Sequence, residues 1–141
     1  MRGRVLHAGA ASAPAARLDA PLSFWGGFDP VTGRIIDQAH PQVGESLTGR
    51  VVVVGGSRGS SGTPGVLAES LRRATGPAGL IVNKADVNLT AGALVAEALY
   101  ECVCPIVLLD DASFADVGSW PGIAITNDGT VSPIVSETAS P

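Results

Sequence analysis

The fold is decided by residues 50–62, which read Arg50-Val51-Val52-Val53-Val54-Gly55-Gly56-Ser57-Arg58-Gly59-Ser60-Ser61-Gly62. The four consecutive valines are typical of a strand that is buried on both faces of a parallel sheet. A loop of glycine and serine follows them. The next residues predict a helix over 63–74, with Thr63 as its N-cap and Pro64 at its first helical position. A strand, a glycine-rich loop and a helix N-terminus together predict an anion site, because free N–H groups and the positive end of the helix dipole converge there.

The remainder of the chain continues this alternation of strands and helices. We expect strands at 34–37, 79–82 and 105–109, helices at 90–99 and near Phe114, and a hairpin of 123–125 with 130–131. In the second helix, the side chains of Leu94, Val95, Ala98 and Leu99 are expected to point inward. The order predicts a single α/β domain over 1–141, with a central parallel sheet and antiparallel additions at both ends.

The two ends of the chain are predicted to contribute little. Residues 1–20 are alanine-rich and weakly patterned, so we expect at most one short strand near Val5 and low order near Ala13-Pro14. Residues 137–141 are expected to form a loose tail.

Composition excludes several classes of function. The chain has 141 residues, 45% of them hydrophobic, and a net charge of −4. It has no basic stripe and only 4% aromatic residues, so nucleic acid and anionic membranes are poor candidate partners. No apolar run approaches the length of a membrane span and no leader-like segment is present, which favours the cytoplasm. The two cysteines, Cys102 and Cys104, suggest buried structural thiols, and we expect no metal ligands in this chain.

The glycine-serine loop fits several kinds of site when it is taken alone. No lysine follows the glycines as in a Walker A loop, and their spacing is not that of a dinucleotide-binding turn. Residues 55–59 match the G-x-S-x-G nucleophile elbow of hydrolases, centred on Ser57, but both histidines, His7 and His40, precede the loop. A plain strand-to-helix turn with capping serines also remains open.

Three further segments carry a family resemblance. They are Pro21-Leu22-Ser23-Phe24-Trp25-Gly26-Gly27-Phe28-Asp29-Pro30-Val31-Thr32-Gly33-Arg34-Ile35-Ile36-Asp37, His40-Pro41-Gln42-Val43-Gly44 and Arg58-Gly59-Ser60-Ser61. Together with residues 92–97 and 105–107 they resemble the small subunit of aconitase X-type enzymes. The resemblance covers roughly residues 21–115, and Gly62-Thr63-Pro64 departs from the family's usual run of serines.

This resemblance implies a swivelling β/β/α domain and a large partner subunit. The partner would hold an iron–sulfur cluster and most of the substrate pocket, and this chain alone would bind no cofactor. Family members dehydrate 3-hydroxy acids: bacterial enzymes act on cis-3-hydroxy-L-proline and archaeal enzymes on mevalonate 5-phosphate. The family's catalytic serine base falls on Ser60, with Arg58, Gly59 and Ser61 as substrate-binding residues.

The substrate and the interface are expected from weaker observations. Eight of the nine cationic residues are arginine, and Lys84 is the ninth. Hyperthermophile proteins are instead rich in lysine, so this composition is more typical of a mesophilic bacterium than of a hyperthermophilic archaeon. Within the family that the sequence resembles, a bacterial origin favours cis-3-hydroxy-L-proline over mevalonate 5-phosphate. The loop residues Phe24, Trp25, Gly26 and Gly27 form a candidate partner interface, although the two aromatics fit a core role equally well. Two other classes stay open: a non-catalytic swivelling module, such as a phosphohistidine carrier, and a stand-alone hydrolase.

Overall fold

The structure is a computed structural model that describes residues 1–56 and 61–134. Its elements, in chain order, are β1 (Arg4–His7), β2 (Ala11–Arg17), α1 (Phe24–Gly27), β3 (Phe28–Asp29), β4 (Arg34–Ile35), β5 (Val51–Val53), α2 (Thr63–Arg72), β6 (Gly79–Val82), α3 (Val87–Tyr100), β7 (Ile106–Leu108), α4 (Asp111–Val117), β8 (Gly122–Ile125) and β9 (Val131–Pro133).

Seven strands form one sheet in the order β1-β7-β6-β5-β2-β8-β9. The four central strands β7, β6, β5 and β2 are parallel to one another, whereas β1, β8 and β9 are added antiparallel. The valines of β5 are buried, as their position between β6 and β2 requires. The predicted parallel centre with antiparallel additions is therefore confirmed.

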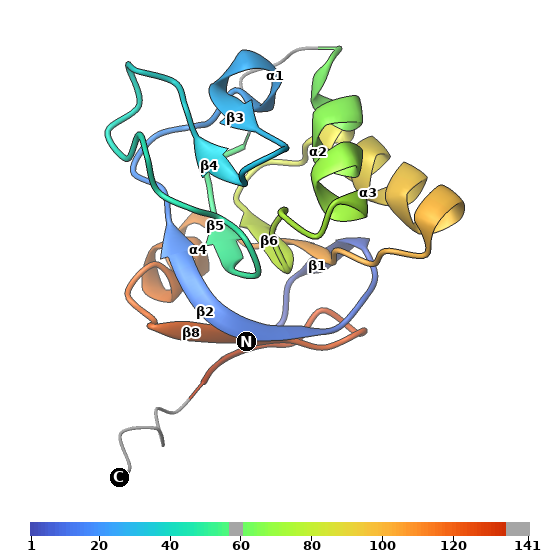
Figure 1. The fold of residues 1–141 in the computed structure, drawn as a ribbon. Coiled ribbons are helices and arrows are strands. Elements are labelled where there is room, and N and C mark those ends of the chain that lie inside the picture. Colours follow the sequence, from blue (N-terminus) through green and yellow to red (C-terminus); the bar gives the residue numbers. More distant parts are fainter. Residues whose placement is uncertain (57–60, 135–141) are drawn as a thin grey trace, which may run out of the picture.

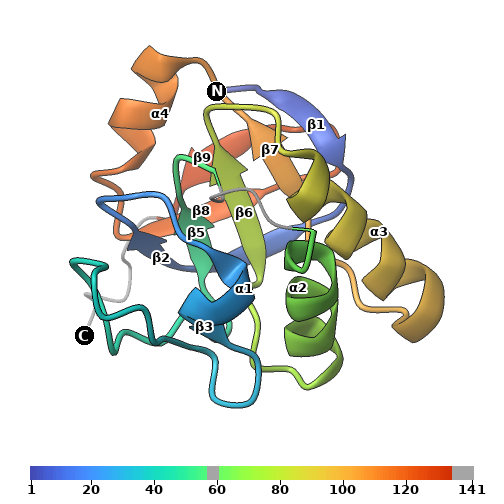
Figure 2. The same cartoon turned by 90° about the horizontal axis from the view of Figure 1, so that it is seen from above.

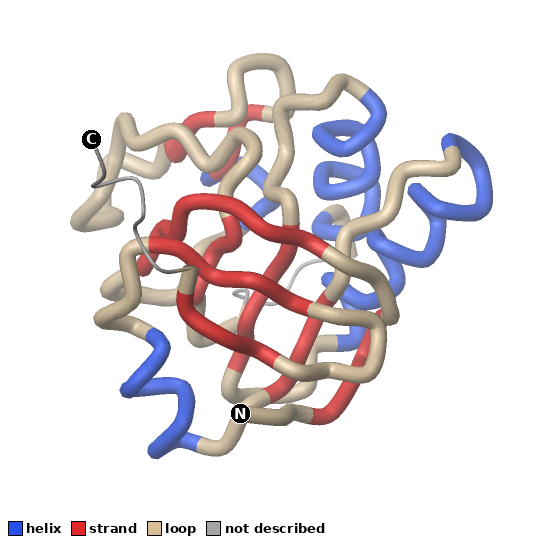
Figure 3. The backbone as a smooth tube through the Cα atoms, turned by 90° about the horizontal axis from the view of Figure 1, so that it is seen from below, coloured by secondary structure: helices blue, strands red, loops and turns tan. Residues whose placement is uncertain are grey.

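The sheet curls, and a different set of elements covers each of its faces. Helices α2 and α3 pack together on one face beside α1 and the β3–β4 ribbon, while α4 lies apart from them (Figures 1 and 2). Figure 3 shows the strands bending across one another on the face away from α2 and α3. One buried cluster lies between the sheet and α1–α3, and a second lies inside the curl, against Val117 of α4.

The N-terminal residues contribute more than their composition predicts. Strand β2 runs through Ala13 and Pro14, where we expected low order. Its first half pairs with β8 and its second half with β5, so β2 joins the parallel centre to the C-terminal hairpin. Alanine side chains give little hydrophobic alternation, and both partner strands are distant in sequence, so the local pattern does not reveal this strand. Residues 137–141 lie outside the described part.

The two long helices differ from prediction at their starts and in one exposed face. Helix α2 takes Gly62, not Thr63, as its N-cap. Helix α3 begins at Val87, with the Asp86 side chain accepting a hydrogen bond from the Leu89 N–H at 3.0 Å. The prediction that Leu94, Val95, Ala98 and Leu99 point inward from this helix is wrong, because all four residues are exposed. The buried face consists of Leu89, Gly92, Ala93 and Ala96.

Candidate functional site

The candidate site lies at the carboxyl edge of the parallel strands, where β5 leads into α2 (Figure 1). The predicted site residues Ser57, Arg58, Gly59 and Ser60 fall between the two described ranges, outside the described residues. The site is therefore defined by the residues around them. Ser61 is exposed in the turn that immediately precedes α2.

Gly56 is held close to two neighbouring segments. Its carbonyl accepts a hydrogen bond from the Leu22 N–H at 3.4 Å. Its φ of +108° lies in the region that favours glycine. A Cβ on Gly56 would lie 3.7 Å from Oδ2 of Asp86, the residue that caps α3. The loop therefore starts between the α1 segment and the N-terminus of α3.

Trp25 covers the other end of the loop. A Cβ added to Gly62 would clash with the indole ring of Trp25, so any larger residue at this N-cap would displace the ring. The Trp25 side chain is nevertheless 59% exposed. The α1 turn is fixed in part by the Ser23 hydroxyl, which donates to the Trp25 carbonyl at 2.8 Å. The aromatic segment therefore packs against Gly62, the residue at which the serine loop meets α2.

The N-terminus of α2 is suited to an anion. Its N-cap residue, Gly62, has no side chain of its own, and its first turn holds no acidic residue. The first N–H groups of an α-helix have no partner within the helix, and with the helix dipole they favour negative charge at this end. A negative charge that develops near Ser61 would therefore be stabilised.

Asn83 and Asp86 are site-edge residues that the sequence reasoning missed. Both residues follow β6, which is the parallel neighbour of β5. Because the carboxyl ends of parallel strands share one edge of a sheet, the predicted strand order already indicated that residues after β6 would lie near the loop after β5. The Asn83 side chain donates to Oδ1 of Asp111 at 3.2 Å. Its own oxygen, Oδ1, is buried without a hydrogen-bond partner among the described residues, as is the hydroxyl of Thr63. Such groups are stabilised when a ligand supplies the missing partner.

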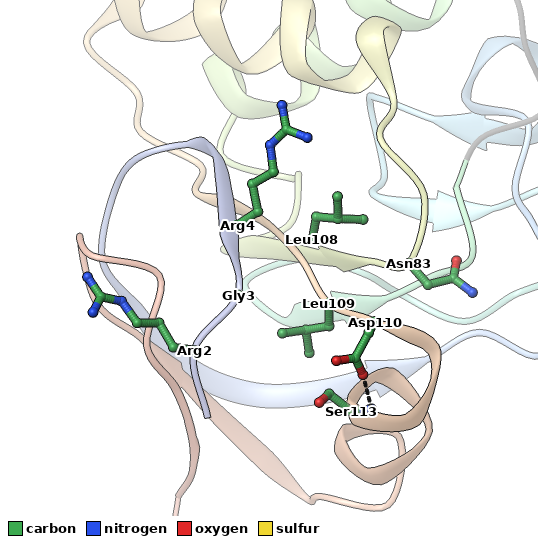
Figure 4. A pocket seen from close by; sticks show the side chains of 8 residues that line it. All are labelled: Arg2, Gly3, Arg4, Asn83, Leu108, Leu109, Asp110 and Ser113. Atoms are coloured by element: carbon green, nitrogen blue, oxygen red, sulfur yellow. Dashed lines mark hydrogen bonds between the residues drawn. The ribbon is translucent and has the colours of Figure 1, made fainter.

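A pocket of about 400 Å³ adjoins Asn83 along the same edge (Figure 4). Arg2 and Arg4 lie on one side of this pocket, and Asp110 on another. Oδ1 of Asp110 accepts a hydrogen bond from the Ser113 N–H at 2.8 Å, and this bond holds the pKa of Asp110 below its usual value. Because its walls carry both signs of charge, the pocket does not select strongly for an anion.

The histidines are occupied by structural contacts. In His40, Nδ1 accepts from the Gln42 N–H and Nε2 donates to the Ala20 carbonyl, both at 3.0 Å. His7 lies 2.8 Å from the carboxylate of Glu97 on α3. Neither histidine lies in the loop between β5 and α2. A phosphohistidine carrier needs a histidine in this loop, and a serine hydrolase needs one in contact with its serine, whereas both histidines of this chain are held by contacts with other residues.

The described residues do not gather a metal-ligand set. Within 1–56 and 61–134, no group of three or more His, Cys, Asp or Glu side chains is placed to hold a metal ion. Burial raises the pKa of Cys104 to about 12, so its thiol stays neutral and is a poor ligand. Across the same ranges, no helix is long and apolar enough to cross a membrane.

The candidate partner interface divides into buried and exposed residues. Phe24 and Gly27 are buried, and the Phe24 ring packs against Phe28 with ring centroids 5.3 Å apart. Phe24 therefore belongs to the core of this chain. Trp25 and Gly26 are exposed beside the loop, and for them contact with a partner stays a prediction.

Comparison with known proteins identifies the family. The sequence profile of the aconitase X swivel domain matches residues 1–132. This chain belongs to that family. The fold agrees: the crystal structure of Thermococcus kodakaraensis aconitase X matches it with a TM-score of 0.80 and 25% sequence identity, over 94% of this chain and 96% of that chain. The resemblance carried by residues 21–37 and the loop is thereby confirmed, as is the swivel-domain fold.

Curated relatives of this swivel domain are dehydratases of two kinds. The cis-3-hydroxy-L-proline dehydratase of Hypocrea jecorina is 37% identical over 133 residues, which are 94% of this chain but 22% of that enzyme. The phosphomevalonate dehydratase small subunit of Methanopyrus kandleri is 46% identical over 76 residues, which are 54% of this chain and 56% of that protein. The swivel domain thus spans about a fifth of the first relative's length.

Proposed function

We propose that this swivel domain is the small subunit of a hydro-lyase that removes water from a 3-hydroxy acid. The observation that carries the proposal is the family match over residues 1–132, since relatives of both kinds are dehydratases. Ser60 is proposed as the base, and Arg58, Gly59 and Ser61 as the residues that bind the substrate.

The reaction requires one proton and one hydroxide to leave the substrate. In the proposal Ser60 takes the proton from the carbon next to the carboxylate, the hydroxyl group leaves the adjacent carbon, a double bond forms between the two carbons, and water is released. A serine hydroxyl is a weak base, so its anion must be stabilised. The N-terminus of α2, which starts three residues beyond Ser60, and the cation Arg58 supply that stabilisation.

An iron–sulfur cluster, which the family resemblance implies, does not fit the residues described here. The described ranges hold no ligand group for it, and the Cys104 thiol is kept neutral by burial. We therefore assign the cluster to a large partner subunit, together with the rest of the pocket. The contribution proposed for this chain is the serine loop and the surface that presents it.

The extent of similarity favours cis-3-hydroxy-L-proline as the substrate. Among relatives that match most of this chain, the Hypocrea jecorina enzyme is 37% identical over 94% of it, whereas the phosphomevalonate dehydratase small subunit of Methanothrix thermoacetophila is 30% identical over 87% of it. A phosphorylated substrate also needs several cations. At this edge Lys84 is exposed after β6, but the carboxylate of Asp86 lies nearer to Gly56 and offsets it. Mevalonate 5-phosphate is the second candidate.

The test is an assay of the chain reconstituted with its large subunit on both compounds. We expect turnover of cis-3-hydroxy-L-proline to exceed that of mevalonate 5-phosphate by on the order of 10²-fold or more, because polar groups built for one substrate reject the other. Loss of water is followed by NMR of the unsaturated product. Faster turnover of the phosphorylated compound would reverse the choice of substrate, and turnover of neither would refute the proposed reaction.

A further inference from the structure

Helix α3 is apolar on the face that points away from the core as well as on the face that points into it. Its inward face is formed by Leu89, Gly92, Ala93 and Ala96. On the outward side, Val87 is 80% exposed and Leu94 is 56% exposed. Glu97 is the helix's one charged residue. A helix that is apolar all round is normally covered all round, so this outward face indicates a missing neighbour.

The exposed side chains form one continuous surface. Val87, Ala91, Leu94 and Ala98 recur at helical spacing and so lie along one stripe of α3, with Val95 beside it. The first part of the stripe borders a hollow of about 470 Å³ that Leu6 and Ala85 also line. Leu99, 66% exposed, continues the apolar surface at the far end. In Figures 1 and 2, α3 lies at the edge of the molecule with α2 on its inner side.

The stripe begins where the candidate site begins. Val87 directly follows Asp86, and Oδ2 of Asp86 lies 3.7 Å from the point that a Cβ on Gly56 would occupy. Gly56 is the last described residue before the serine loop. A protein that closes over the loop to complete the site therefore meets the first turn of α3 at the same time.

We propose that the outward face of α3, from Val87 to Leu99, is a docking surface for the large subunit. This inference rests on the proposed function. Relatives are either small subunits or single chains of which this domain is about a fifth, so in each case a much larger or separate protein body accompanies the domain. The face is nearly uncharged, so the matching surface of the large subunit is apolar, and the affinity should change little with salt.

The test measures binding of the separately purified large subunit, without substrate, by isothermal titration calorimetry. Val87→Glu and Leu94→Glu place charges on the stripe without removing core side chains. We expect each substitution to raise the Kd at least about tenfold, because it would bury an unpaired charge in an apolar interface, and the pair to raise it further. The wild-type Kd should change less than about threefold between 50 and 500 mM salt.

Val31→Glu is the matched control, because Val31 is 58% exposed in the turn between β3 and β4, away from α3. All variants should keep the wild-type melting temperature within a few degrees. An unchanged Kd for the Val87→Glu, Leu94→Glu double variant would overturn the inference. An equal loss in the Val31→Glu control would also overturn it, as would self-association of the free chain through this face with binding of the large subunit unaffected.

This experiment separates the interface from the chemistry. The Ser60→Ala variant should bind the large subunit with the wild-type Kd, because Ser60 is not part of the stripe. Normal binding combined with no dehydration would count against the proposed reaction and leave the docking surface standing. Weak binding of the stripe variants combined with normal turnover at saturating large subunit would support the surface directly.

Discussion

Replacing Ser60 by alanine should lower turnover of the reconstituted enzyme by about 10²–10⁴-fold, the usual effect of removing a general base. In the sequence Ser60 precedes the N-terminus of α2, where the helix dipole would stabilise the proposed serine anion, and alanine offers no group to hold the proton. Folding and partner binding should be unchanged. Steady-state kinetics on the reconstituted pair, with circular dichroism for the fold, measures the effect.

The two other serines of the loop provide matched controls. Ser57→Ala should lose much less activity than Ser60→Ala, because Ser57 is closer to the end of β5 than to α2. Ser61→Ala should be intermediate, since its exposed hydroxyl can bind the substrate carboxylate without moving a proton. If Ser57→Ala were inactive while Ser60→Ala kept near-normal turnover, the base would be misassigned and the nucleophile-elbow reading of residues 55–59 would be restored.

Phe24→Ala should reduce the free energy of unfolding by about 3–5 kcal/mol, the range for removing a buried aromatic side chain. Phe24 is fully buried and packs against Phe28 in the cluster between the sheet and α1–α3. This is a large share of the stability of about 5–15 kcal/mol typical of a domain. Urea denaturation of the isolated chain measures it.

A substitution of Trp25, the aromatic residue next to Phe24, distinguishes a role in the core from a role in the interface. Trp25→Ala should cost about 1 kcal/mol or less of stability, because the indole is largely exposed. Trp25 nevertheless covers Gly62 at the start of α2, so its loss should affect the loop rather than the fold. If the Phe24→Ala chain were as stable as wild type but bound the large subunit more weakly, Phe24 would be an interface residue and not a core residue.

The parts of the fold that the sequence predicts are those with a strong local signal. The valine run of β5, the proline near the start of α2 and the turn around Gly129 each restrict the local backbone, and these elements appear where expected. Strand β2 lacks such a local signal, because its alanine-rich sequence is held in a strand by pairing with β5 and β8, which are distant in sequence. Its position depends on tertiary contacts.

The exposed face of α3 illustrates a second limit. Residues 87–100 are apolar on nearly every side, so the sequence does not say which side meets the sheet. We expected the larger side chains Leu94, Val95 and Leu99 to point inward, yet the small residues Gly92, Ala93 and Ala96 do. Gly92 allows close packing here, since its backbone lies against Pro64 and Leu67 of α2. The large side chains Leu94, Val95 and Leu99 are consequently exposed.

The candidate site was predictable in its position but not in its neighbours. A strand followed by a glycine-serine loop and a helix is local information, and the structure has that order of elements. Trp25 over Gly62 and Asp86 near Gly56 are contacts between segments distant in sequence. Only the expected parallel pairing of β5 with β6 indicates that residues after Val82 lie at the same edge of the sheet as the loop after β5.

The most direct test of the central claim is dehydration of cis-3-hydroxy-L-proline by the 141-residue chain and the large subunit, each assayed alone and then mixed. The claim that this domain supplies one part of a shared active site predicts no measurable turnover by this chain alone. It predicts turnover that rises with added large subunit and saturates at one chain per partner. Turnover by the pure chain, or full activity of the large subunit without it, would contradict that claim.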